Sequence, residues 1–480
     1  MKRSLVLCLA ALLLSAVCAG CAAAPEELYI FNTKGENADA LRHAADAFTE
    51  ETGVRVRVFS LGSGADSTEV LRTEMNARKK PAIFCVMNGV ALTEWVEGGF
   101  ARPLSAALTD GFRKLADGIP EAFALSDGEM RYGVPFNLEG YGYIADTAML
   151  ESLFEDTDGL LPALRDCGYA EWEALVGVLS RYIREGEASS VTLGGRTFAL
   201  RSEKTGRARA LEGVFAVAGS QNWTYGDHML NVALNAVFRD PLAAANATEA
   251  ELERLTGALT AYARALDLKT ANAVPPRGAR LITSTEGGYD AAVENLAAGR
   301  AVFLKQGNWV SPNFASTSDP DAVQRLCFLP VKLPLTDADV TVPGRSAASI
   351  NASIPVFVPN YYVINAKVTE TEQIWAEEFL VWLNTSETGQ RFVREEMGFI
   401  PYNADPETFE APNALAASIL AYVRDGRTLS NPYAGAPVNW SGQTVGQYVM
   451  ERYLARESWD EGAYADIARY AVDSWKRMRA

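Results

Sequence analysis

Apolar positions near the start of the chain change their spacing in the way that alternating strands and helices require. Residues 27–31 (ELYIF) form a short apolar run, which predicts a strand. Over 37–52 the apolar residues recur three and four positions apart, which predicts a helix that Asn37 caps and Gly53 ends. Residues 54–59 (VRVRVF) then alternate, as in a strand with one face in water.

A second helix and a third strand continue this order. The helix covers roughly 66–79, and 81–86 (PAIFCV) is a continuous apolar run, typical of a strand buried between two layers. Strand, helix, strand, helix and strand predict an α/β fold with a parallel sheet. Ligands of open α/β sheets bind beyond the carboxyl ends of the strands, so we expect functional residues in the loops 32–36, 60–66 and 87–89.

The rest of the chain is mainly helical between shorter strands. Residues 131–150 predict a crossing between domains, and 191–200 predict a β-hairpin that turns at Gly194 and Gly195. The remaining patterns predict a helix and strand over 289–309, a strand at 356–367, two helices over 369–398 joined near Ser386, and two C-terminal helices at 441–456 and 459–479.

Length and charge limit the class of protein. A chain of 480 residues is too long for one core, so we expect two domains, or three. The formal net charge is -16, and the acidic residues are spread along the chain. Such a surface repels nucleic acid and anionic lipid, which argues against both as partners and leaves neutral or cationic small ligands.

The N-terminus resembles a bacterial lipoprotein signal. Lys2 and Arg3 precede an apolar run that ends in small residues before Cys21, where the sequence turns polar. The resemblance implies that residues 1–20 are a signal peptide, that Cys21 carries lipid, and that 21–26 are a tether. Lipoprotein signals usually have a leucine three positions before the lipidated cysteine, and this sequence has Cys18 there. An uncleaved transmembrane anchor is the alternative, although the run is short.

Reactive residues give no sign of catalysis. Cys85, Cys167 and Cys327 have no paired spacing and predict free thiols. The two histidines are His43, on a solvated helix face, and His228, and the sequence contains no G-x-S-x-G, H-E-x-x-H or phosphate loop. We therefore expect no enzyme activity, no metal and no cofactor.

Four segments, in this order after the signal, resemble the family 1 extracellular solute-binding proteins, the carbohydrate receptors of bacterial ABC importers. They are FNTKGENADALRHAADAFTEETGVRVRV from residue 31, YGVPFNLEGYGYIADTAML from 132, AAVENLAAGRAVFLKQGNW from 291, and YYVINAKVTETEQIWAEEFLVWLNTSETGQRF from 361. The resemblance covers nearly the whole chain after the signal and rests on the order and spacing of these segments.

The resemblance implies the two-lobe α/β architecture of type II periplasmic binding proteins, with a hinge and a cleft between the lobes. The first lobe is expected to contain 27–137 and 301–336, and the second lobe 138–300 and 337–480. Proteins of this kind trap a sugar or oligosaccharide by hinge closure and pass it unchanged to a membrane permease. The resemblance also implies a monomer, held by Cys21 on the outer side of the cell membrane.

Sugar recognition directs attention to aromatic residues in loops, because a pyranose has flat C–H faces and a rim of hydroxyls. Taken alone, Trp309 in the sequence GNW is typical of a buried core residue. The resemblance makes it a stacking residue beside Asn308, and gives Trp223 and Trp440 similar positions. Tyr361 and Tyr362 alternate along a strand, so only one of them can face a ligand, and we take Tyr361.

Polar candidates come from the same comparison. Glu139 matches a position where a carboxylate meets sugar hydroxyls, with a hinge salt bridge as the alternative. Lys34 and Glu36 follow the first strand and are otherwise solvated loop charges. Asn88 ends the strand at 81–86 and is otherwise a turn residue.

Three other functions remain open. One is a lipoprotein receptor for a peptide or another polar solute, and the second is a binding protein coupled to a sensor kinase. The third, a secreted glycosidase, needs two carboxylates that flank the scissile bond, and nothing in the sequence marks such a pair.

Overall fold

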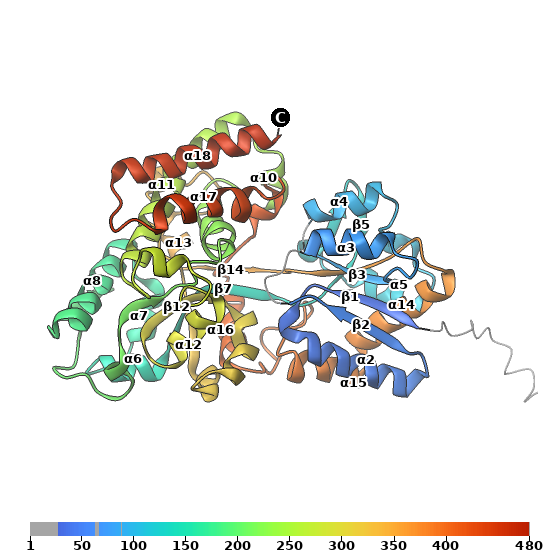
Figure 1. Cartoon of the computed structure of the whole chain (residues 1–480), viewed down its shortest axis with the longest axis horizontal. Coiled ribbons are helices and arrows are strands. Elements are labelled where there is room, and N and C mark those ends of the chain that lie inside the picture. The colour runs from blue at the N-terminus through green and yellow to red at the C-terminus, as the bar shows by residue number, and fades with distance from the viewer. Residues whose placement is uncertain (1–26, 63–66, 88, 480) are drawn as a thin grey trace, which may run out of the picture. The chain divides into compact units, whose positions relative to one another are not determined.

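The computed structural model describes residues 27–62, 67–87 and 89–479 (Figure 1). Cys21 and the expected signal peptide lie outside these residues, as does Asn88. The chain divides into two compact units. Among described residues, unit 1 contains 27–86, Trp95–Val134 and Tyr361–Phe392, and unit 2 contains Met87–Glu94, Pro135–Asn360 and Val393–Ala480 apart from residues 88 and 480.

Unit 1 is built on the parallel sheet that the sequence predicts. Its strands lie in the order β2-β1-β3-β15, in which β1 pairs in parallel with β2 and β3, while β15 is antiparallel to β3. Gly53 ends α2 with a left-handed φ of 77°, as expected of a glycine after the last turn. The strands are β1 (Leu28–Asn32), β2 (Val56–Ser60), β3 (Ile83–Val86) and β15 (Tyr361–Ile364), with a separate pair β4 (Leu125–Asp127) and β5 (Met130–Tyr132).

Aromatic rings join two helices of unit 1. Phe48 of α2 contacts Phe379 and Trp382 of α14, with ring centroids 5.2 and 5.4 Å apart. Thr369 and Glu372 form a capping box at the start of α14, and Ser386 caps α15 where the sequence predicts the junction. The helices are α2 (Ala38–Thr52), α3 (Ser67–Asn76), α5 (Asp110–Asp117), α14 (Glu370–Thr385) and α15 (Glu387–Arg391); α4 (Gly89–Glu97) contains the boundary between the units.

Unit 2 has a mixed sheet in the order β11-β10-β12-β7-β14-β16, with β13 also paired to β7. β10 is parallel to β11 and β12, and β7 is antiparallel to β12, β13 and β14. The strands are β7 (Glu139–Asp146), β10 (Gly213–Ala216), β11 (Ala273–Val274), β12 (Ala301–Gly307), β13 (Leu326–Leu329), β14 (Ile354–Phe357) and β16 (Thr428–Leu429). The predicted hairpin is confirmed as β8 (Ser190–Leu193) and β9 (Arg196–Ala199), joined by Gly194 and Gly195, both with positive φ.

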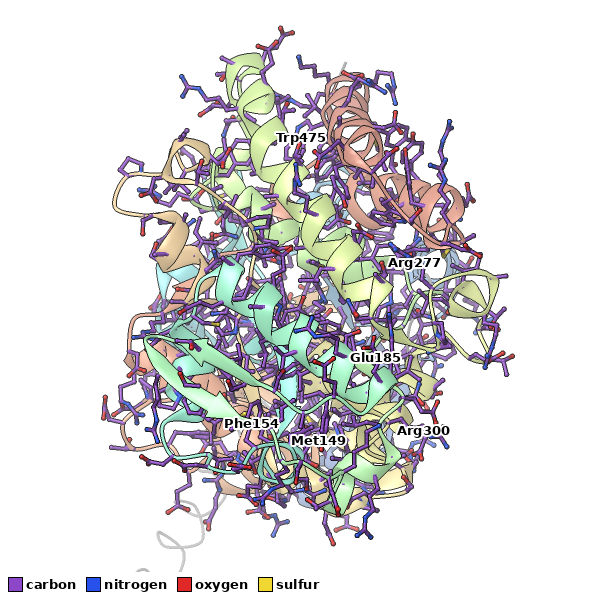
Figure 2. The ribbon with its side chains drawn as sticks, turned by 90° about the vertical axis from the view of Figure 1, so that its left-hand side faces the viewer. Met149, Phe154, Glu185, Arg277, Arg300 and Trp475 are labelled. Carbon is purple, nitrogen blue, oxygen red and sulfur yellow. The ribbon has the colours of Figure 1, made fainter. Side chains whose placement is uncertain are left out.

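Helices α11 and α18 lie side by side in unit 2 (Figures 1 and 2). Thr248 and Glu251 form a capping box at the start of α11, and Trp475 of α18 is fully buried. The helices of unit 2 are α6 (Thr147–Leu153), α7 (Leu160–Asp166), α8 (Tyr169–Glu185), α9 (Leu230–Leu234), α10 (Pro241–Ala245), α11 (Glu249–Ala271), α12 (Tyr289–Ala297), α13 (Ala347–Asn351), α16 (Ala414–Arg424), α17 (Gln447–Val449) and α18 (Glu461–Arg479).

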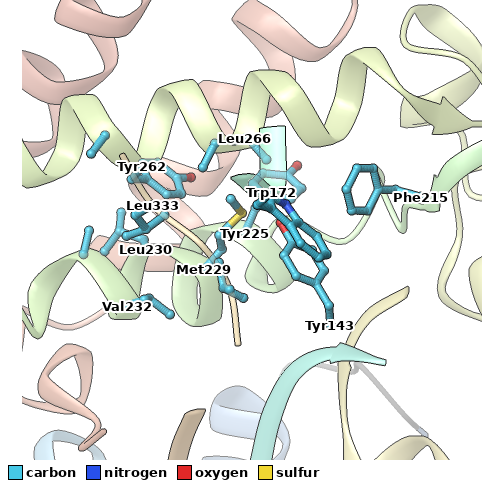
Figure 3. Packing of buried hydrophobic residues seen from close by; sticks show 14 of the residues in the cluster. Tyr143, Trp172, Phe215, Tyr225, Met229, Leu230, Val232, Tyr262, Leu266 and Leu333 are labelled. Atoms are coloured by element: carbon cyan, nitrogen blue, oxygen red, sulfur yellow. The ribbon is translucent and has the colours of Figure 1, made fainter. Parts of the chain in front are cut away.

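A dense aromatic core fills unit 2 between the sheet and its helices (Figure 3). Tyr143 of β7 stacks on Trp172 of α8 with ring centroids 5.1 Å apart, and both rings contact Phe215 and Phe303. The side chains on one face of β7, β10 and β12 pack into this core, and the residues between them point to the opposite face of the sheet.

The expected division of the later segments between the two domains is wrong. Residues 301–336 do not return to the first unit, because β12 pairs with β10 and β7 inside unit 2. The segment that returns is Tyr361–Phe392, because β15 pairs with β3. The single strand expected at 356–367 is accordingly two strands, β14 in unit 2 and β15 in unit 1.

Two further observations concern thiols and membranes. Cys85, Cys167 and Cys327 are free, and the first two are buried. None of the described helices combines the length and hydropathy that a membrane span needs.

Candidate binding site in unit 2

Seven ring side chains from separate segments of unit 2 form one cluster, which we call the aromatic cluster. Its members come from β7, from the π-helical turn η5 (Thr224–Met229) and the residue before it, from α12, β14, and the 3₁₀ turns η7 (Asn308–Ser316) and η11 (Pro432–Gly435). They are Tyr141, Trp223, His228, Tyr289, Trp309, Phe357 and Tyr433. Trp223, Tyr289, Phe357 and Tyr433 are partly exposed, so the cluster reaches the surface of unit 2.

Trp309 is held in a single orientation within this cluster. Its Nε1 donates a hydrogen bond of 3.0 Å to Oε1 of Gln306. Its ring folds back over Gly307, where a Cβ atom would lie 2.1 Å from Cζ3 of the indole. Only glycine leaves room for that approach, so the β12 terminus positions the indole. Trp309 is buried, with 9% of its surface exposed, and belongs to the hydrophobic core of unit 2.

The imidazole of His228 lies at the centre of the cluster. It stacks on Tyr141 with ring centroids 4.4 Å apart and an interplanar angle of 17°. The rings of Trp309 and Trp223 lie 5.0 and 5.2 Å from it, and their own centroids are 6.3 Å apart. The two indoles and the imidazole therefore contact one another in edge-to-face and tilted arrangements, which aromatic rings prefer to a face-to-face sandwich.

Polar groups surround the rings, and several lack partners. Oδ1 of Asn308 accepts a 3.0 Å hydrogen bond from the Gly140 backbone N–H. Nδ2 of Asn308 has no hydrogen-bond acceptor among the residues that the structure describes. Buried Nε2 of Gln306 and Nδ1 of His228 are also without partners within the described parts of the chain. An unpaired buried amide or imidazole nitrogen is costly, so these atoms mark a place where the described chain leaves hydrogen bonds unmade.

A carboxylate adjoins the cluster at the start of β7. Glu139 is buried, and its Oε1 accepts a hydrogen bond of 3.2 Å from Nδ2 of Asn137. Burial, followed by Asp227 and then Glu139, raises the pKa of Tyr433, which places this carboxylate within electrostatic reach of the rings. Carboxylates that accept hydrogen bonds are able to bind hydroxyl groups of a ligand.

Buried charges beneath the rings shift one another's titration. Burial raises the pKa of Asp227 to about 6, although the hydrogen bond from the Ser441 hydroxyl and the nearby Lys305 lower it. Burial and then Lys269 lower the pKa of Lys305 well below the usual lysine value. Burial and Lys305 lower the pKa of His228 as well, so the imidazole is neutral at pH 7. The cluster therefore presents a neutral heteroaromatic ring to its surroundings.

Four of the predicted residues meet at this place. Trp309, Asn308 and Trp223 belong to the cluster or adjoin it, and Glu139 lies at its edge. Across residues 27–62, 67–87 and 89–479, no group of three His, Cys, Asp or Glu side chains is arranged to hold a metal ion. The arrangement favours binding through ring faces and hydrogen bonds.

The prediction for Trp440 is wrong. Its side chain is 0% exposed, and its Nε1 donates to the backbone oxygen of Ala471 at 2.9 Å and to Oγ of Ser474 at 3.0 Å. The ring contacts Trp475 with centroids 4.4 Å apart. The π-helical turn η12 (Trp440–Gly446) directs it into the core, so it offers no face to a ligand.

The other predicted residues lie in unit 1 or outside the described residues. Lys34 is buried after β1, and its backbone N–H and C=O both bond to the side chain of Asn32. Tyr361 is buried at the start of β15, opposite Val86. Glu36 lies in the 3₁₀ turn η1 (Gly35–Asn37), and nothing is described of its side chain. Asn88 and Cys21 fall outside the described residues.

Sequence reasoning missed several members of the site. Tyr141 lies two residues after Glu139 on β7, so strand alternation places both on one face and could have identified it. Gln306 lies two residues before the predicted Asn308. Phe357 and Tyr433 come from distant segments, and no local pattern joins them to the others.

Comparison with known proteins agrees with this architecture. The family model for bacterial extracellular solute-binding proteins matches residues 43–417. Among curated protein sequences, none matches the chain. Solved structures with a similar fold include a chitin oligosaccharide binding protein, with 16% identity, a TM-score of 0.60, and coverage of 95% of this chain and 100% of that one.

Two further structures show the same fold at low identity. A Streptococcus pneumoniae solute-binding protein in complex with the blood group A-trisaccharide has 15% identity and a TM-score of 0.60, over 94% of this chain and 100% of its own. The GacH receptor of Streptomyces glaucescens has 13% identity and a TM-score of 0.60, over 94% and 98% of the two chains. Because the family model spans well over half of the sequence, the chain belongs to the bacterial extracellular solute-binding proteins.

Proposed function

We propose that this protein is the substrate-binding component of a carbohydrate ABC importer, which captures a sugar or oligosaccharide and delivers it to a membrane permease. Family membership supports the binding role. Proteins of similar structure bind a chitin oligosaccharide, raffinose and a blood group trisaccharide. The fold that this chain shares with them supports a carbohydrate ligand here.

The arrangement around Trp309 carries the proposal. Its indole is fixed by Gln306 and Gly307, with a second indole 6.3 Å away at an angle of 57°. Unpartnered nitrogens of Gln306 and Asn308 lie on the same short segment. Ring faces beside amide donors match the C–H faces and hydroxyl rim of a pyranose. We propose Trp309, Trp223, Asn308 and Glu139 as ligand-binding residues in unit 2.

Within unit 1, we propose Lys34, Glu36 and Tyr361 as ligand-binding residues, and we also propose Asn88. Lys34 and Tyr361 follow or begin strands of the same sheet, and both are buried. We further propose that Cys21 carries a lipid that tethers a monomer to the outer face of the cell membrane. The family's extracellular role supports this location.

A screen of purified protein by thermal shift tests the function. Mono- and oligosaccharides that bind the folded state raise the melting temperature, and at equal concentration the tighter ligand raises it more. Chito-, xylo- and raffinose-series sugars are the first set. Calorimetry on the best ligand then compares wild type with Trp309→Phe and with the core variant Trp382→Phe. We expect weaker binding only for Trp309→Phe, since Trp382 bonds to Glu51 and packs in unit 1.

Other outcomes would redirect the proposal. If peptides raise the melting temperature and no sugar does, the protein is a peptide receptor and not a carbohydrate receptor. Chromatography of the recovered ligand distinguishes binding from hydrolysis, since a receptor returns its sugar intact. Pull-down with a permease subunit against a kinase ectodomain separates import from sensing.

A further inference from the structure

A pocket with a cavity volume of about 270 Å³ opens in unit 2 between α7, β13 and α16. It shares no residue with the aromatic cluster. It is lined by Cys327, Phe328 and Leu329 of β13 and by the partly exposed Leu161 and Arg165 of α7. The pocket thus joins an apolar base to a charged edge.

The third wall leaves the space open because its side chains are small. Ala414, Ser418 and Ala421 of α16 face the pocket at intervals of four and three residues, which places them on one side of the helix. The helix cannot move inward to fill the gap, because two hydrogen bonds set its distance from β13. Phe328 N–H donates to Oγ of Ser418 at 3.0 Å, and the Tyr422 hydroxyl donates to Phe328 O at 3.1 Å.

The polar edge of the pocket offers hydrogen-bond donors. The Arg165 guanidinium lies 4.4 Å from the centroid of the Tyr422 ring, and its NH2 group bonds to Asp425 at 3.2 Å. These contacts fix the side chain, yet its buried Nε–H has no acceptor within the described residues. The Ser418 hydroxyl accepts from Phe328, so its own hydrogen remains available to donate.

We propose that this pocket is a second ligand site, which binds a small carboxylic acid with an aromatic or branched apolar body. The carboxylate meets Arg165 and the Ser418 hydroxyl, and the body packs on Phe328 and Leu161. Donors at one edge and apolar walls elsewhere suit a ligand with oxygen acceptors at one end only. A sugar, with hydroxyls around its whole rim, would lose hydrogen bonds on the apolar floor. The site does not depend on the proposed carbohydrate function.

Calorimetry with 3-phenylpropionate tests the site, with 3-phenyl-1-propanol as the uncharged match. We expect the acid to bind with 1:1 stoichiometry and the alcohol about tenfold more weakly, the scale of one charge-assisted hydrogen bond. Arg165→Gln should remove this preference, while Arg427→Gln, which breaks a surface pair with Asp166, should keep it.

Filling the pocket gives the second test. Ala421→Leu should abolish binding of the acid, whereas Ala417→Leu, on the exposed side of α16, should leave it unchanged. Melting curves check that each variant folds, and Ala414→Leu serves if Ala421→Leu does not. Binding of neither compound, equal binding of the alcohol, or binding that survives both filled variants would each overturn the proposal. Binding lost in Trp309→Phe would place the acid at the aromatic cluster and overturn it too.

Discussion

The contact between Gly307 and Trp309 gives the sharpest prediction for the site. In Gly307→Ala, the new methyl would lie 2.1, 2.3 and 2.4 Å from three atoms of the indole. Carbon atoms rest about 3.5–4.0 Å apart, so the ring must move by more than an ångström. The backbone itself tolerates alanine, because φ of Gly307 is -114°. The substitution therefore displaces one aromatic ring without a backbone penalty.

The expected cost has two parts. The displaced indole loses its 3.0 Å hydrogen bond to Gln306, worth about 1 kcal/mol. Forcing a methyl into a packed site costs about 1–3 kcal/mol more. We expect the free energy of unfolding of Gly307→Ala to fall by about 2–4 kcal/mol, so that it unfolds at lower urea concentration. Its affinity for the sugar found by the screen should fall about thirtyfold, the scale of one aromatic anchor.

Urea unfolding and calorimetry measure the two effects on the same preparation. Gly177→Ala in α8 is the matched control, because its Cβ would meet only Arg181, at 3.7 Å. Replacing this helical glycine should stabilise the protein by about 0.5–1 kcal/mol and leave affinity unchanged. If Gly307→Ala kept wild-type affinity while Trp309→Phe lost it, the orientation set by Gly307 would have no role in binding.

Three further predictions follow from buried side chains. Trp440→Ala should cost about 3–5 kcal/mol of stability, measured by urea unfolding, with unchanged ligand affinity in the folded fraction, because its ring is core. Lys305→Met should raise the melting temperature, because Lys305 is 4% exposed and its Nζ has no hydrogen-bond partner among the described residues. A lower melting temperature would mean that the contact of Nζ with the Tyr141 ring, 4.7 Å from the centroid, outweighs the cost of burying the charge. Burial lowers the pKa of Lys269 to about 7. Between pH 7 and the usual lysine pKa of 10.5, the unfolded chain therefore holds a proton on Lys269 that the folded protein lacks. Over this range, the contribution of Lys269 to the free energy of unfolding should rise by about 1.4 kcal/mol per pH unit. Urea unfolding at pH 7.5 and 9 should show the rise in wild type and a smaller one in Lys269→Met; equal slopes would refute it.

Local chemistry made much of the fold predictable. The hairpin at 190–199 followed from two adjacent glycines, and the end of α2 from Gly53, because φ above zero is cheap only for glycine. The parallel order of β1, β2 and β3 followed from alternating periods. Each of these depends on neighbours within a few residues.

Long-range pairing was less predictable. The apolar pattern of residues 301–307 predicts a strand but fits either unit. Only the pairing of this strand with β7 and β10 assigns it to unit 2. Trp440 follows the residues PVN, as Trp309 follows GN, yet the Trp440 indole bonds to α18 and the Trp309 indole bonds to Gln306, in a cluster that reaches the surface. The difference arises from α18, which lies over thirty residues away and supplies Ala471 and Ser474.

The late return of β15 to the sheet of unit 1 has a consequence for folding. β3 ends at Val86, but its antiparallel neighbour begins only at Tyr361, after most of unit 2 has been made. One side of β3 therefore stays uncovered until residues 361–364 are present, wherever the chain folds. Fragments that end before residue 361 should expose this strand edge and aggregate.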